Sequence, residues 1–108
     1  MEVSSNPSPP RRSPAAAALL PVFIAHRGRD LASILAALDQ GDFETVARLG
    51  HNMRGNGNSY GFPEISAIGK ELEAAAKARD EESIRDQMAM LEVWIEQHGV
   101  VTAGGEHV

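Results

Sequence analysis

The sequence predicts an all-α fold, an antiparallel up-down-up-down four-helix bundle. Apolar residues recur at spacings of three and four over most of the chain, and β-branched residues never gather into the alternating runs that are typical of strands. Glycine, proline and aspartate divide the periodic part into segments joined by turns of two or three residues. Connections this short force consecutive helices to lie antiparallel.

The first helix is expected over residues 19–40, with Gly41 at the position where a left-handed residue commonly follows a helix. The spacing predicts one buried stripe, made of Leu20, Phe23, Ile24, Arg27, Leu31, Ile34, Leu35 and Leu38. Residues 1–14 are rich in proline and serine and are predicted to form a disordered tail. Arg11-Arg12 and the apolar residues after them imitate a secretory signal, but Pro21 interrupts that run, so we expect no such signal.

The second helix is expected to start after Asp42, which has the side chain of an N-cap, and to end near Tyr60. Gly61 then suits a left-handed C-cap, which is a structural role. At 3.6 residues per turn the apolar or small positions of this helix form one stripe, made of Phe43, Val46, Ala47, Gly50, Met53 and Gly57.

The third helix is expected to start at Pro63 and to bury Ile65, Ile68, Leu72, Ala75 and Ala76. Its small side chains predict close packing against the glycine-rich part of the second helix. The fourth helix is expected to follow the cap Asp80 and to bury Ile84, Met88, Leu91, Trp94 and Ile95, while Met53 and Met90 are also assigned to packing. The predicted bundle therefore spans residues 15–98, and residues 99–108 are predicted to be a short tail.

Length, cysteine content and charge limit the possible functions. A chain of 108 residues makes one small domain, without room for a separate catalytic one. The sequence contains no cysteine, which excludes disulfides and thiolate sites and is compatible with the cytoplasm. Its formal net charge of −5 argues against nucleic acid or an anionic membrane as the main partner, and we expect a monomer.

His51 lies at the edge of the second stripe, in a segment whose composition does not favour a helix. Three glycines lie within residues 50–57, and each costs about 1 kcal/mol relative to alanine in a helix interior, so their presence indicates another role. Gly55 leaves one flank of the ring clear, while Arg48 and Arg54 lie within side-chain reach. Neutral imidazole is a nucleophile and arginine neutralises phosphate oxygens, so the pattern indicates a phosphoryl-accepting histidine.

Around this histidine the sequence resembles the histidine-containing phosphotransfer (HPt) domains of bacterial phosphorelays. Their motif is His-x-x-Lys-Gly followed by small residues, with a glycine ten positions after the histidine and an apolar residue beside it. The matching residues are His51-Asn52-Met53-Arg54-Gly55, Asn56, Gly57, Asn58, Ser59, Gly61 and Phe62. Arg54 replaces the usual lysine, which keeps the charge but changes its geometry. The likeness extends over roughly residues 20–98, including Gly41-Asp42-Phe43-Glu44 and Glu71-Leu72-Glu73.

The resemblance implies a phosphocarrier in a two-component phosphorelay, not an enzyme acting alone. Nε2 of His51 would accept a phosphoryl group from the phospho-aspartate of one receiver domain and pass it to the aspartate of another. The implied partners are response-regulator receiver domains and a hybrid sensor kinase. The receiver would supply the aspartate, a lysine and a divalent metal, so no cofactor is expected on this chain. The rival hypothesis is a non-catalytic adaptor that docks a receiver or kinase without being phosphorylated.

Simpler interpretations remain open for several of these residues. Arg54 can form a surface ion pair with a carboxylate of the second or third helix, and the role of Arg48 is equally undecided. Asn58 and Ser59 are either polar contacts for a partner or helix-end residues that satisfy backbone groups.

The other histidines and the carboxylates are assigned structural roles. His26 precedes Arg27-Gly28 but lacks the small residues that follow His51, His98 is expected to stabilise a helix C-terminus, and His107 falls in the predicted tail. A carboxylate metal site in a bundle uses Glu-x-x-His, which does not occur here, so no metal site is expected. The remaining acidic residues are interpreted as solvated faces, namely Glu71, Glu73, Glu81, Glu82, Glu92 and Glu96.

Overall fold

The computed structural model describes residues 19–107, with side chains to residue 99, and within this range it contains helices and no strand. The helices are α2 (Leu20–Asp39), α3 (Phe43–Tyr60), α4 (Pro63–Lys77) and α5 (Glu81–His107). The all-α class is therefore confirmed for the described part of the chain. The tail predicted over residues 1–14 lies outside the described residues.

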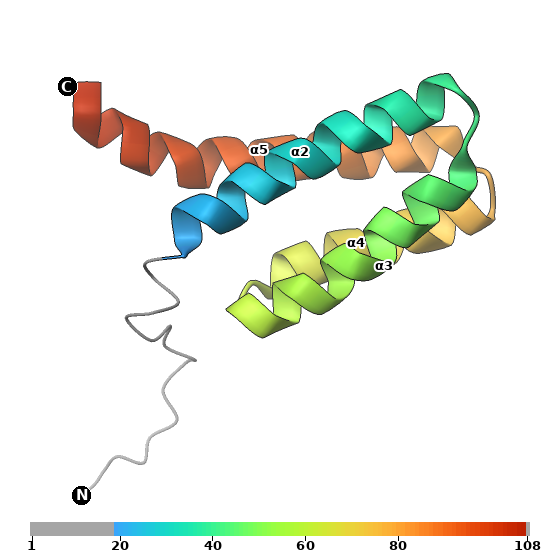
Figure 1. Cartoon of the computed structure of the whole chain (residues 1–108), viewed down its shortest axis with the longest axis horizontal. Coiled ribbons are helices and arrows are strands. Elements are labelled where there is room, and N and C mark those ends of the chain that lie inside the picture. Colours follow the sequence, from blue (N-terminus) through green and yellow to red (C-terminus); the bar gives the residue numbers. More distant parts are fainter. Residues whose placement is uncertain (1–18, 108) are drawn as a thin grey trace, which may run out of the picture.

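The four helices pack side by side in two pairs. In Figure 1 α2 lies beside α5 and α3 lies beside α4, and each helix runs opposite to the one before it. Contacts between α2 and α3 and between α4 and α5 join the two pairs. This arrangement is consistent with the antiparallel bundle expected from the sequence. None of the described helices combines the length and the apolar character needed to cross a membrane.

The predicted N-caps of α3 and α5 and the predicted glycines after α2 and α3 are confirmed. The carboxylate of Asp42 accepts a hydrogen bond from the backbone N–H of Thr45 at 3.1 Å, and Asp80 accepts one from Ser83 N at 3.1 Å. Gly41 and Gly61 adopt the left-handed conformation, with φ of 66° and 81°. A side chain is strained there, so glycine is the residue that suits both turns.

The core is a single cluster to which every helix contributes. Its fully buried large side chains are Val46, Met53, Ile34, Ile65, Leu72, Ile84 and Leu91. At one end Phe62 joins an aromatic group, with its ring centroid 5.2 Å from that of Phe23 and 5.1 Å from that of Trp94. Burying several aromatic rings in this way contributes strongly to the stability of so small a domain.

Two side chains are more exposed than predicted: Leu35, which was assigned to the buried stripe, and Met90, which was assigned to core or boundary packing. Leu35 is 45% exposed and Met90 is 54% exposed. Each lies next in sequence to a buried residue, Ile34 and Leu91, and an α-helix rotates by about 100° per residue. That rotation carries both side chains beyond the edge of the buried stripe.

The fourth predicted helix is longer than the sequence suggested. We predicted its end at His98, but α5 continues to His107, so the backbone of residues 99–107 is helical. Gly99 does not adopt the left-handed conformation that would end the helix. A single glycine in a helix costs only about 1 kcal/mol, which is too little to stop α5 by itself.

Candidate functional site

The site is built on the middle of α3, where His51 points away from the core. Its side chain is 59% exposed, while Gly50 and Met53 on either side of it are buried. The N-cap at Asp42 and the left-handed Gly61 fix both ends of α3, so the ring is presented from a rigid element rather than from a loop.

Glycines bring α3 and α4 into backbone contact beneath the site. A Cβ added to Gly50 would lie 2.7 Å from the backbone nitrogen of Glu73, and one added to Gly69 would lie 2.6 Å from the carbonyl oxygen of Gly50. Ser66 crosses the same contact and donates a hydrogen bond to the carbonyl oxygen of Arg54 at 2.6 Å. The close packing predicted between these two helices is confirmed.

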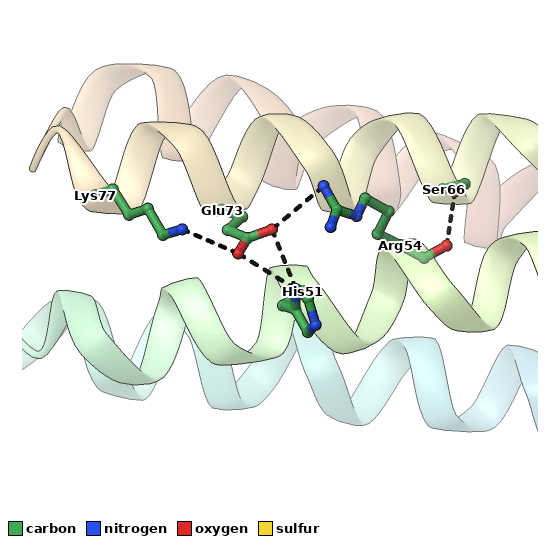
Figure 2. A network of polar contacts seen from close by, with 5 residues as sticks. All are labelled: His51, Arg54, Ser66, Glu73 and Lys77. Atoms are coloured by element: carbon green, nitrogen blue, oxygen red, sulfur yellow. Dashed lines mark hydrogen bonds and ion pairs between the residues drawn. The ribbon is translucent and has the colours of Figure 1, made fainter.

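This approach places Glu73 of α4 directly opposite His51. One carboxylate oxygen of Glu73 lies 3.3 Å and the other 3.4 Å from Nδ1 of His51. Two cations also contact the carboxylate, with Nζ of Lys77 at 3.2 Å and Nη1 of Arg54 at 3.7 Å. Figure 2 shows the carboxylate between these three groups.

The carboxylate is ionised at neutral pH. Burial acts to raise the pKa of Glu73, but hydrogen bonds from Lys77 and His51 and their charges outweigh it and lower that pKa below its ordinary value. An ionised carboxylate can only accept hydrogen bonds, so a neutral His51 must donate to it from Nδ1. The proton assignment follows from this acceptor.

The other ring nitrogen, Nε2, has a different environment. With the proton on Nδ1, Nε2 keeps its lone pair, and no described residue forms a hydrogen bond or ion pair with it. A half-exposed imidazole in this tautomer is a nucleophile directed at solvent or at a docked partner. Arg54 and Lys77 place two cations beside the ring, on the carboxylate of Glu73, and cations of this kind suit transfer of a phosphoryl group.

The predicted neighbours of His51 lie on two different sides of α3, one facing α4 and one facing away from it. Helical geometry turns Arg54 toward α4, where it meets Glu73, and turns Arg48 and Gly55 away from α4. A Cβ on Gly55 would meet nothing within 4 Å, so the ring is unobstructed on that flank. Arg48 is exposed and lies outside the Glu73 cluster. Asn58 and Ser59 are exposed on the last turns of α3.

Sequence reasoning missed Glu73 and Lys77. The sequence pattern assigns Glu73 to a solvated face, but its side chain is only 15% exposed and it contacts His51. A signal was present, because His51 and Glu73 lie equally far along the chain from Phe62, in the turn of the α3–α4 hairpin. An antiparallel pair with little offset brings such positions together.

The predicted role of His98 is wrong. Because α5 continues past it, His98 lies within the helix, where its ring stacks on Trp94 with centroids 4.0 Å apart. Its Nδ1 lies 2.9 Å from the carbonyl oxygen of Trp94 and donates to it.

The two other histidines lie apart from the site. His26 is exposed on α2. His107 belongs to α5 by its backbone, and its side chain lies outside the described residues. Among the side chains of residues 19–99 no three His, Asp or Glu are grouped as a metal site.

Comparisons with known proteins agree with this geometry. No curated protein and no solved structure gave a significant match. The family model described as "Hpt domain" matches residues 18–99, which includes α2, α3, α4 and most of α5. Hpt domains are phosphocarriers of two-component phosphorelays, which work through a phosphohistidine. The chain therefore belongs to the Hpt domain family.

Proposed function

We propose that His51 accepts a phosphoryl group from the phospho-aspartate of one receiver domain and passes it to the aspartate of another. The observation that carries this proposal is the asymmetry of the ring: Nδ1 is engaged by Glu73, whereas Nε2 is open to solvent. Only the open nitrogen has both the lone pair and the access that attack on a phosphoryl group requires.

The surroundings of His51 suit in-line transfer between two partners. Gly55 clears one flank for the approach of the receiver, and Arg54, at 43% exposed, is close enough to reach oxygens on the transferred group. Phosphoryl transfer depends mainly on positioning and charge neutralisation, so a nucleophile with adjacent cations is sufficient on this side of the complex. The receiver would supply the acceptor aspartate, a lysine and a divalent metal, and a hybrid sensor kinase would supply the phosphoryl group. The cytoplasmic location and the monomeric state expected from the sequence remain part of this proposal.

The test is phosphoryl transfer from radiolabelled phospho-receiver domains to the purified chain. We expect label on the chain that is lost in acid and retained in alkali, as for a phosphohistidine. The variant His51→Gln should take up none, and the matched variant His26→Gln should behave like the unchanged chain, because His26 lies on α2 outside the Glu73 cluster. Label that persists in His51→Gln would disprove the site. A chain that binds receivers but takes up no label would be the adaptor of the rival hypothesis.

A further inference from the structure

A groove between α4 and α5 lies on the far side of α4 from the phosphotransfer site. Its volume is about 360 Å³, and its walls include Trp94 and the apolar side chains of Met90 and Val93, which are 54% and 49% exposed. An α-helix turns by about 100° per residue, so Glu71 of this groove and Glu73 of the phosphotransfer site face nearly opposite directions. The α4–α5 groove is therefore a separate surface.

The α4–α5 groove carries two carboxylates without a matching cation. Glu64, in the first turn of α4, accepts a hydrogen bond from Nε1 of Trp94 at 3.3 Å, and Glu71 lies exposed about two turns further on. Neither carboxylate forms an ion pair with a described residue, and no described lysine or arginine lines the groove. Beside them Met90 and Val93 present apolar surface. A complementary occupant therefore combines positive charge with apolar side chains.

A segment with this composition directly precedes α2. Arg11 and Arg12 are followed by Ser13, Pro14 and four alanines at positions 15–18. The segment contains no acidic residue, so it complements a groove whose charged side chains are carboxylates. The proposed phosphotransfer makes no use of this pattern of arginine and alanine.

The start of α2 lies close to one end of the α4–α5 groove. The backbone N–H of Phe23 donates to the carbonyl oxygen of Leu19 at 2.9 Å, and the ring centroid of Phe23 lies 5.8 Å from that of Trp94. Figure 1 shows the start of α2 at the end of the bundle where α4 begins. The eight residues 11–18 span at most about 26–29 Å, whereas the distance along α4 from Glu64 to Glu71 is only about 10 Å. The segment before α2 is thus long enough to enter the groove and to follow it as far as Glu71.

We propose that residues 11–18 bind in the α4–α5 groove of the same chain. The alanines lie over Val93 and Trp94, and the two arginines pair with Glu71. A segment on a short tether has an effective concentration of about 1 mM, so even a weak contact is substantially populated. The predicted tail of residues 1–14 is then attached to the bundle through its last residues. Because the groove lies on the far side of α4 from His51, the inference does not rest on the proposed function.

The experiment uses a nitroxide label on the full chain. The sequence contains no cysteine, so Ser13→Cys provides a single attachment point, and the one tryptophan gives a single indole N–H signal in the groove. Broadening is measured by ¹H–¹⁵N NMR against the same sample after reduction of the nitroxide. Asn56 is the reference, because it lies near Leu19 in a different groove, between α2 and α3, where the tether alone brings the label as near.

We expect strong broadening of the groove signals. The indole signal of Trp94 and the amide signals of Met90 and Val93 should lose at least about half of their intensity, because a contact with a Kd of about 1 mM is about half populated at that effective concentration. Asn56 should lose clearly less. Equal broadening of Asn56 and of the groove signals would overturn the inference, since it would indicate a segment without a preferred surface.

Charge reversal in the labelled chain tests the pairing. Arg11→Glu with Arg12→Glu should reduce the broadening in the groove to the level at Asn56, and Glu71→Arg should do the same. The matched control Glu44→Arg, at an exposed glutamate of α3, should change nothing. Combining Glu71→Arg with both arginine substitutions should restore the broadening, and circular dichroism verifies that each variant is helical. Broadening that survives either reversal, or that the combination fails to restore, would overturn the inference.

A mixture of two samples tests whether the segment binds within one chain. The nitroxide-labelled chain without ¹⁵N is mixed with a ¹⁵N chain that carries no nitroxide. We expect the groove signals of the ¹⁵N chain to keep their intensity. Broadening as strong as that in the labelled ¹⁵N chain would overturn the inference and identify a second copy as the source of the segment.

Discussion

At the scale of single residues, one contact between α3 and α4 makes the two ring nitrogens of His51 different. Its exposure follows from its place at the edge of the buried stripe of α3, but exposure alone leaves the two ring nitrogens equivalent. Glu73 makes them different by taking the hydrogen bond of Nδ1. Arg54, in the position where the family usually has lysine, then adds a cation on the α4 side of the ring.

The charge of Arg54 should contribute to phosphoryl transfer. A hydrogen bond to a charged group contributes about 1.5–3 kcal/mol, and because Arg54 is 43% exposed we expect the lower end. Arg54→Ala should therefore slow transfer from a phospho-receiver about tenfold, measured by single-turnover kinetics. Arg54→Lys should stay within about threefold, because the charge remains.

Arg48→Ala is the control for that experiment. Arg48 is also a cation of α3, but it lies outside the Glu73 cluster, so its loss should change the rate by less than about twofold. Equal effects of Arg48→Ala and Arg54→Ala would contradict a specific role for Arg54 and indicate general electrostatic attraction.

At the scale of the helices, the glycines of α3 serve two different purposes. Gly50 and Gly57 face α4, where an added Cβ would collide with backbone atoms, whereas a Cβ on Gly55 would meet open space. The first two determine how closely α3 and α4 approach, and hence the position of Glu73. Gly55 lies on the open flank of the ring and is not required by the packing of this chain.

Replacing these glycines by alanine should therefore have opposite effects on stability. Gly57→Ala forces a methyl group onto the backbone of Ser66 and should lower the free energy of unfolding by at least about 2 kcal/mol. Gly55→Ala should raise it by about 0.5–1 kcal/mol, because alanine is the better helix former. Urea denaturation measures both values.

A larger side chain at position 55 separates stability from function. If Gly55 gives the receiver access to the ring, larger side chains there should slow transfer without unfolding the chain. Gly55→Leu should thus retain its helical signal and lose phosphoryl uptake from a receiver. Full uptake in Gly55→Leu would show that this flank is not part of the approach.

At the scale of the whole molecule, the carboxylates make stability depend on pH. Hydrogen bonds from the residue three positions on lower the pKa of Asp42 and of Asp80 below the ordinary value of 3.8, and the cations around it lower that of Glu73 below 4.5. For a lowered pKa the stabilisation is complete above the ordinary value and is lost as pH falls through the folded-state value. The pKa of Asp30 shifts in the opposite direction, because burial raises it despite the ion pair with Arg27.

We therefore expect the free energy of unfolding to be level above about pH 5 and to fall below pH 4.5, as these groups become protonated. The double variant Asp42→Asn, Asp80→Asn isolates the two caps, because asparagine caps a helix about as well as aspartate but does not titrate. As pH falls, the free energy of unfolding of this variant should decrease less steeply than that of the unchanged chain. Urea denaturation at a series of pH values measures this dependence. If the free energy of unfolding decreases equally in both proteins as pH falls, these two aspartates do not contribute to the pH dependence of stability.

Most of the local structure could be predicted because its causes lie within a few residues. The caps Asp42 and Asp80, the left-handed Gly41 and Gly61 and the start of α4 at Pro63 all depend on contacts no more than one turn away. The face on which a residue lies was less certain at the edges of the stripes, where Leu35 and Met90 proved exposed. Small differences in helix rotation decide such positions, and packing against the neighbouring helices sets that rotation.

The sequence by itself determined the helical class and the caps at the helix ends, apart from the C-terminal end of α5. It also determined His51 as the candidate nucleophile. Only the tertiary structure decided which nitrogen of His51 is engaged, because that depends on Glu73, far along the chain and on another helix. The physical reason is that periodicity and capping are local, whereas an ion pair between helices depends on their relative register. Here the backbone contacts at Gly50, Gly57 and Gly69 set that register.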